Sequence, residues 1–138
     1  TKMIDEQTLK AAQAKANEAE TARVLASVPK TSAGFEKDYN AMRKDDGAVL
    51  RFLQNIPLTT VEGYFKKSEV PFEVLQGILG SMARAGEGDW MGNFLVSLAK
   101  AENFDMTLMF CEDADRANVD AITKKVSAGV ASAVKSKY

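Results

Sequence analysis

The chain has 138 residues, of which 46% are hydrophobic and 27% are charged, a composition typical of one globular domain. Its 18 basic and 19 acidic residues give a net charge of −1, so it lacks the positive excess that nucleic-acid binding normally requires. One cysteine excludes an internal disulfide, and the absence of histidine removes the usual residues of zinc sites and acid–base catalysis.

No apolar run approaches the roughly 20 residues that cross a bilayer, so we expect no membrane contact and a cytoplasmic location, with the nucleus as an alternative. The sequence begins with Thr1 rather than methionine, which suggests a piece of a longer chain.

The first block, residues 5–27, is rich in Ala, Glu, Lys and Gln and predicts a helix with little apolar surface. It is either an exposed linker helix or a helix that docks through Val24, Leu25 and Val28. Because Pro29 interrupts the pattern, we divide the chain into a linker helix at 1–31 and a helical protein-binding domain at 32–138.

From residue 32 onward, apolar residues recur at helical spacing between regular breakers. Ser32 is a candidate cap for the first helix, and Asp45 or Asp46 for the second, which ends at Pro57. Thr59 or Thr60 is expected to start a short third helix. A longer helix follows Pro71, with an apolar stripe at Phe72, Leu75, Ile78, Leu79 and Met82, and ends at Gly86.

Asp89 is expected to cap a helix that starts with Trp90, and Asn103 to stop it. Trp90 either closes over the edge of the core or is exposed as an interface anchor. After Cys111 the chain is acidic and later basic, which suits the dipole of one last helix. Without any strand-like alternation, we predict an all-α fold, a compact array of about six short helices after an Ala-rich linker helix.

Few residues suggest catalysis. The acidic pairs Asp45-Asp46 and Glu112-Asp113 could bind a hard cation, but carboxylates at helix starts are usually caps. Cys111 has no histidine partner and is expected to be a buried structural thiol. We therefore expect no enzyme, no metal and no cofactor.

The segment Phe104-Asp-Met-Thr-Leu-Met-Phe-Cys111 is the most informative part of the sequence. At about 100° per residue, its apolar side chains point around nearly the whole circumference of a helix. Such a helix needs to be covered, either by the rest of the domain or by a partner protein. We expect most of the segment to lie in the core, with one or two side chains reaching a partner.

Four motifs in order carry a resemblance to a known family: Gly34–Tyr39 (GFEKDY), Phe52–Pro57 (FLQNIP), Phe65-Lys66 ahead of Val74-Leu75, and Phe104–Phe110 (FDMTLMF). Together they resemble the C-terminal domain of RNA polymerase II-associated protein three and of related dynein-arm assembly factors, over about residues 32–126. The last motif is the most specific.

The resemblance implies an all-helical adaptor domain of a co-chaperone, which docks on a RuvB-like AAA+ ATPase ring and supports the assembly of large protein complexes. The alternative is a self-associating structural domain of an axonemal dynein-arm assembly factor, with the N-terminal helix contributing to oligomers. The domain alone is expected to be monomeric in the first case.

The resemblance also places the partner contact around the FDMTLMF motif. The predicted contact residues are Lys100, Glu102, Asn103, Met106, Met109 and Phe110, the first two as a polar rim. Methionine and phenylalanine are adaptable apolar anchors, which suits such a surface. Relatives tend to carry a basic residue where this chain has Asn103, so one charged contact is expected to be missing or supplied elsewhere.

Overall fold

The computed structural model describes residues 28–138, which contain eight helices and no strand. The helices are α2 (Ser32–Met42), α3 (Asp46–Gln54), α4 (Leu58–Tyr64), α5 (Phe72–Ala85), α6 (Trp90–Leu98), α7 (Phe104–Leu108), α8 (Asp113–Thr123) and α9 (Ala128–Lys137). Residues 1–27, which make up most of the linker helix predicted for residues 1–31, lie outside the described residues, and so does the part in oligomers predicted for this helix. The all-α prediction is confirmed.

Helix number differs from the prediction mainly at the end of the sequence. The single last helix that we expected is two helices, because the chain turns between Thr123, the last residue of α8, and Ala128, the first residue of α9. No proline or glycine marks this turn. It is fixed instead by tertiary contacts of Lys125 with the last turn of α5 and of Ser127 with the connection between α5 and α6.

The helix starts follow the predicted capping only in part. Thr31, not Ser32, caps α2, and its Oγ1 accepts a hydrogen bond from the Gly34 amide at 3.0 Å. Asp45 caps α3 as expected. α4 begins directly after Pro57 and not at a threonine.

The starts of α6 and α8 show one capping prediction that was wrong and one that was right. The Asp89 carboxylate makes no capping bond to α6 and instead accepts a hydrogen bond from the Ser127 amide at 2.6 Å, which joins two connections. The acidic start of α8 is a capping box between Glu112 and Asp115, which satisfies the free amides there. The interpretation of the second acidic pair as a cap is thus confirmed for Glu112, whose partner in the box is Asp115 and not Asp113.

The core extends through all the helix layers. At the N-terminal end, Phe35 is fully buried and its ring lies 5.6 Å from that of Phe52, 5.5 Å from that of Tyr64 and 5.9 Å from that of Phe65. This cluster contains aromatic residues of three motifs of the family resemblance. They therefore hold α2, α3 and α4 together.

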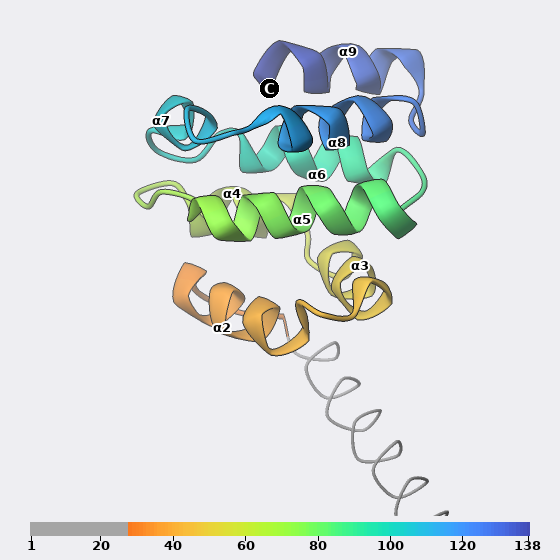
Figure 1. Ribbon diagram of the computed structural model, residues 1–138. Coiled ribbons are helices and arrows are strands. Elements are labelled where there is room, and N and C mark those ends of the chain that lie inside the picture. The colour runs from red at the N-terminus through yellow and green to blue at the C-terminus, as the bar shows by residue number, and fades with distance from the viewer. Residues whose placement is uncertain (1–27) are drawn as a thin grey trace, which may run out of the picture.

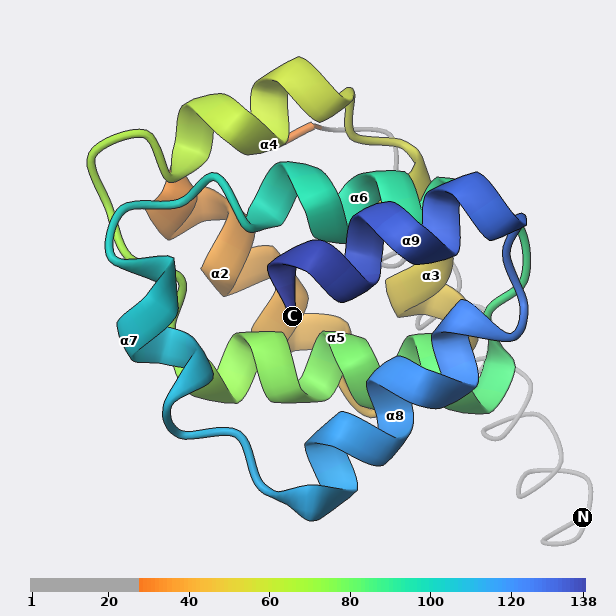
Figure 2. The same ribbon diagram turned by 90° about the horizontal axis from the view of Figure 1, so that it is seen from above.

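The helices α5 and α6 lie at the centre of the domain, and each packs mainly against two other helices. α5 packs on α3 and α8, while α6 packs on α4 and α9 (Figure 1). Seen from above, α9 lies over α6, and α7 is set apart at one edge of the molecule (Figure 2). In both views the C-terminal end of α9 points toward α7.

The described helices are too short or too polar to cross a membrane. Residues 28–138 also contain no group of three or more Cys, Asp or Glu side chains placed to hold a metal ion.

Candidate protein-docking surface

The predicted contact segment forms α7, a helix of only five residues. Asn103 precedes it in the left-handed conformation, at φ 53°, which reverses the chain after α6 and is tolerated by asparagine better than by most residues. Phe104 and Thr107, three positions apart, are the buried residues of the helix. The remaining side chains are therefore turned toward its outer side.

Three large apolar side chains are exposed on this outer side. The exposed fractions are 57% for Met106, 81% for Met109 and 65% for Phe110. The Phe110 ring lies 5.9 Å from the ring of Phe72, the first residue of α5, which is half-buried. We call these four residues, Phe72, Met106, Met109 and Phe110, the α7 surface.

The exposure of this segment corrects our expectation that most of it lies in the core. Within the FDMTLMFC segment, Phe104 and Thr107 are buried, whereas Leu108 and Cys111 are only half-buried. The physical reason is the position of α7 at the edge of the fold, where one side of a short helix meets the domain (Figure 2).

On one side, α7 is attached to the connection between α4 and α5. The Glu102 amide donates to the Phe65 carbonyl at 3.1 Å, and Asn103 Nδ2 donates to Glu69 Oε1 at 2.9 Å. Thr107 Oγ1 is buried and donates to the Val70 carbonyl at 3.2 Å. These bonds fix the start of α7 relative to α5, and so place Phe110 beside Phe72.

On its other side, α7 is attached to the end of α9. The ring of Phe104 meets the ring of Tyr138 edge-on, with centroids 5.3 Å apart and planes at 78°. The Tyr138 hydroxyl donates to the Leu95 carbonyl of α6 at 2.7 Å. α7 is therefore held from two directions by residues far apart in the sequence.

The predicted polar residues lie beside this surface and have partners within the chain. Lys100 Nζ lies 2.6 Å from Glu62 Oε1, and both side chains are exposed enough that the pair adds little stability. Glu102 and Asn103 are exposed next to it, with Asn103 bonded to Glu69. Whether any of the six predicted residues contacts a partner stays a prediction.

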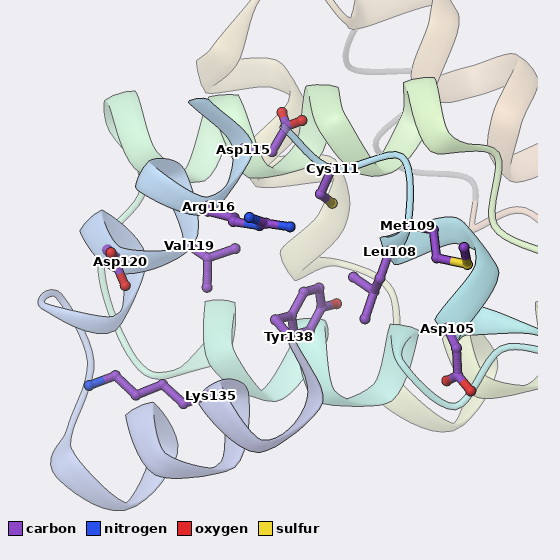
Figure 3. A pocket seen from close by; sticks show the side chains of 10 residues that line it. All are labelled: Asp105, Leu108, Met109, Cys111, Asp115, Arg116, Val119, Asp120, Lys135 and Tyr138. Carbon is purple, nitrogen blue, oxygen red and sulfur yellow. The ribbon is translucent and has the colours of Figure 1, made fainter. Parts of the chain in front are cut away.

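A hollow of about 590 Å³ is lined by the α7 segment, α8 and the end of α9 (Figure 3). Leu108 and Met109 line it from the α7 side, Val119 from α8 and Tyr138 from the end of α9. The Arg116 side chain extends into it (Figure 3). One flank of α7 thus faces an open space and not a neighbouring helix.

Cys111 also lines this hollow and is half-buried, which is less burial than we expected. Burial raises the pKa of the Cys111 thiol, and the nearby Asp115 carboxylate raises it further. A thiol with a raised pKa stays protonated at neutral pH and is a poor nucleophile. The geometry therefore favours a structural role for this cysteine.

Trp90, which we expected at the core edge or exposed, is half-buried, and its indole Nε1 donates to the Glu87 carbonyl at 2.7 Å. This bond holds the Trp90 ring against the connection before α6, which agrees with the prediction that Trp90 covers the edge of the core.

Sequence reasoning missed two residues of the site. Phe72 was assigned to the core stripe of α5, but it belongs to the α7 surface, and Glu69 holds Asn103. The position of Phe72 next to Pro71, at the very start of the helix, was the available signal, because first-turn residues often lie at the margin of a core.

Comparison with known proteins agrees with these features. A sequence model of one protein family, described as "Potential Monad-binding region of RPAP3", matches residues 28–116. The solution NMR structure of the C-terminal domain of human RPAP3 has a similar fold, with a TM-score of 0.65 and 19% identity, covering 81% of this chain and 89% of that one. No curated protein matched the chain.

The family match covers more than half of the chain and includes all four motifs of the resemblance, from Gly34–Tyr39 to the helix α7 with its exposed methionines. The chain therefore belongs to the family of the RPAP3 C-terminal domain.

Proposed function

We propose that this chain is a non-catalytic adaptor domain of a co-chaperone, which docks on a RuvB-like AAA+ ATPase ring through the α7 surface. The observation that carries the proposal is the exposure of Met106 in α7 together with Met109 and Phe110, the two residues that directly follow this helix. By docking there, the domain would bring the rest of its parent protein to the ATPase and support the assembly of large complexes.

The physical case starts from the cost of exposing these side chains. Single exposed apolar residues are common on protein surfaces, but a group of large ones usually marks an interaction site. Met106 and Met109 have flexible side chains that adapt to the shape of a partner, and Phe110 can serve as a central anchor.

Preorganisation adds to the case. The hydrogen bonds of Glu102, Asn103 and Thr107 fix α7 before any partner arrives. A surface that is already ordered loses less conformational entropy on binding, which leaves more of the apolar contact for affinity.

The family description supports a protein ligand, because it names a potential Monad-binding region. Monad is therefore the competing partner in the test, and the same surface is available to it. The RuvB-like ATPase is preferred here because the family resemblance of the FDMTLMF motif, which forms α7, implies it.

The test is a binding titration of the purified chain, by calorimetry, against the RuvB-like ATPase and against Monad from the same organism. Phe110→Asp is expected to weaken ATPase binding by at least about 30-fold, as for an interface hot spot, and Met106→Ala by less. Leu58→Asp is the matched control, since Leu58 is 41% exposed at the end of α4 away from α7 (Figure 2).

Circular dichroism and thermal unfolding would establish that all three variants are folded. Wild-type binding to Monad alone would replace the ATPase as the partner, and binding to neither would refute the proposal. A folded Phe110→Asp variant that binds the ATPase as well as wild type would remove the α7 surface as the site.

A further inference from the structure

We propose that Tyr138 is a positioning residue for the α7 surface: its ring, fixed to α6, contacts α7 through Phe104 and keeps Met106, Met109 and Phe110 in their binding geometry. The inference rests on the proposed function for its consequence in binding. Its structural part, that Tyr138 orders α7, can be tested without any partner.

The first argument is the contact itself. Phe104 is the one large apolar side chain of α7 that is buried, and the edge of its ring meets the ring of Tyr138 at 5.3 Å. Edge-to-face pairs of this geometry attract each other beyond the burial of their surface. Tyr138 therefore holds the residue by which α7 is anchored in the domain.

The second argument is that Tyr138 is itself fixed in place. Its hydroxyl donates to the Leu95 carbonyl in α6 at 2.7 Å, and its amide donates to the Val134 carbonyl at 3.0 Å. Leu95 and Val134 are fully buried. Burial also raises the pKa of Tyr138 well above its ordinary value, so its hydroxyl stays a donor at every physiological pH.

The third argument is the shortage of other support on the flank of α7 that faces α8. A helix of five residues is not stable alone, because helix nucleation is costly. On the flank toward α8, Leu108 and Met109 border the 590 Å³ hollow, and Tyr138 lies at the centre of its lining (Figure 3). On the opposite side, α7 is held by the buried bond of Thr107 to the Val70 carbonyl and by the bond of Asn103 to Glu69, which is exposed, so water competes with it.

Tyr138 and the whole of α9 lie outside residues 28–116, the part matched by the family. The contact of Tyr138 with Phe104 therefore joins the matched part of the chain to the part that follows it.

The experiment compares Tyr138→Ala and Tyr138→Phe with Lys137→Ala, an exposed neighbour, as the control. Hydrogen–deuterium exchange of the α7 amides, such as those of Thr107 and Met109, is measured relative to the amides of α5. Tyr138→Ala is expected to speed exchange in α7 about tenfold while α5 stays protected, and to weaken ATPase binding about tenfold, because fewer molecules hold the binding geometry. Tyr138→Phe keeps the ring but loses the hydroxyl bond to the Leu95 carbonyl, so it is expected to weaken binding by less than Tyr138→Ala, about 2- to 4-fold.

Each outcome decides the proposal. Unchanged α7 exchange in Tyr138→Ala, or equal acceleration in α5 and α7, would overturn the positioning role whatever the partner. Faster exchange in α7 with unchanged binding would overturn its consequence for docking, whereas failure of the wild type to bind would refute only the proposed function. If Tyr138→Ala does not fold, Tyr138→Leu keeps apolar bulk without the aromatic edge, and the same comparison applies.

Discussion

The ring of Phe110 lies 5.9 Å from the ring of Phe72, with the two planes inclined at 44°. This contact joins the end of the α7 segment to the first turn of α5, one of the two central helices. Phe110 is thereby exposed to a partner but is not free to turn in any direction. The orientation of this side chain is thus a property of α5 as much as of α7.

We predict that Phe72→Ala weakens binding to the ATPase about 3- to 10-fold, because the aromatic pair that orients Phe110 is lost. The domain should stay folded, since Phe72 is only half-buried. Phe72→Leu keeps most of the apolar contact and serves as the matched control. Calorimetric affinities of the two variants would check this, and an unchanged affinity of Phe72→Ala would show that the pair does not orient Phe110.

The left-handed backbone of Asn103 predicts an unusual order of stabilities at this position. Asn103→Ala is expected to lower the free energy of unfolding by about 1–2 kcal/mol, because alanine tolerates this conformation poorly. Asn103→Gly is expected to stay within about 0.5 kcal/mol of wild type, because glycine adopts it freely. Urea denaturation of both variants would check this order. Equal losses would mean that the bond to Glu69, which both variants lack, matters more than the backbone.

The sequence predicted well those elements whose signal is local. The apolar spacing of Val49, Phe52 and Leu53 identified α3, and Asp45 identified its start, because a helix face and a cap are read within a few residues. Phe35 and Phe52, which lie on the inner faces of α2 and α3, meet in the core.

The rest depends on contacts between residues far apart in the chain. The apolar pattern of FDMTLMF indicated that the helix needs covering, but not that it lies at the edge of the fold, which is decided by Phe104 meeting Tyr138 and Thr107 meeting Val70. Likewise, the break between α8 and α9 follows from Lys125 reaching the end of α5, which no local signal announces.

The ion pair between Asp46 and Arg84 predicts a pH-dependent part of the stability. Hydrogen bonds from the Arg84 guanidinium and from Ser81 hold the pKa of Asp46 below its usual 3.8. Because the folded state favours the ionised carboxylate, the contribution is complete well above pH 3.8 and is lost as the pH falls through the lower, folded-state pKa.

We predict that Asp46→Asn lowers the free energy of unfolding by about 1 kcal/mol at neutral pH, a modest value because the Arg84 side chain is largely exposed. The difference from wild type should disappear at pH values below the folded-state pKa. Glu73→Gln, which removes an exposed charge on the same helix as Arg84, is the control. A difference between Asp46→Asn and wild type that persisted unchanged to the lowest pH would contradict the ion-pair explanation. Urea unfolding at a series of pH values measures this difference in the free energy of unfolding.

Lys125 closes the C-terminal end of α5. Its ammonium donates to the carbonyls of Ala83 at 2.7 Å and Gly86 at 3.1 Å, where the helix leaves carbonyl groups without partners. Lys125→Met is expected to lower the free energy of unfolding by about 1–2 kcal/mol, and Lys124→Met, at the exposed neighbour, to have little effect. Thermal unfolding of the pair would check this, and equal melting temperatures would exclude the capping role.

The close approach of α6 and α9 depends on Gly92. A Cβ atom at this position would lie 2.1 Å from Val130 Cγ1, and 3.2 Å from Val134 Cγ2, so any larger residue pushes α9 away from α6. Gly92→Ala is therefore expected to lower the free energy of unfolding by about 1–3 kcal/mol.

Val130→Ala removes the methyl group that the new Cβ would meet, so the double variant Gly92→Ala, Val130→Ala should be more stable than the sum of the two single effects predicts. A double-mutant cycle by urea denaturation measures this coupling, which we expect to be at least about 1 kcal/mol. If the effects of the two single substitutions simply add, the clash is relieved by a shift of the ends of α9 and not by the loss of the Val130 methyl group. In that case the Gly92→Ala single variant should also disturb Tyr138, because it follows directly on α9, and exchange in α7 would rise with it.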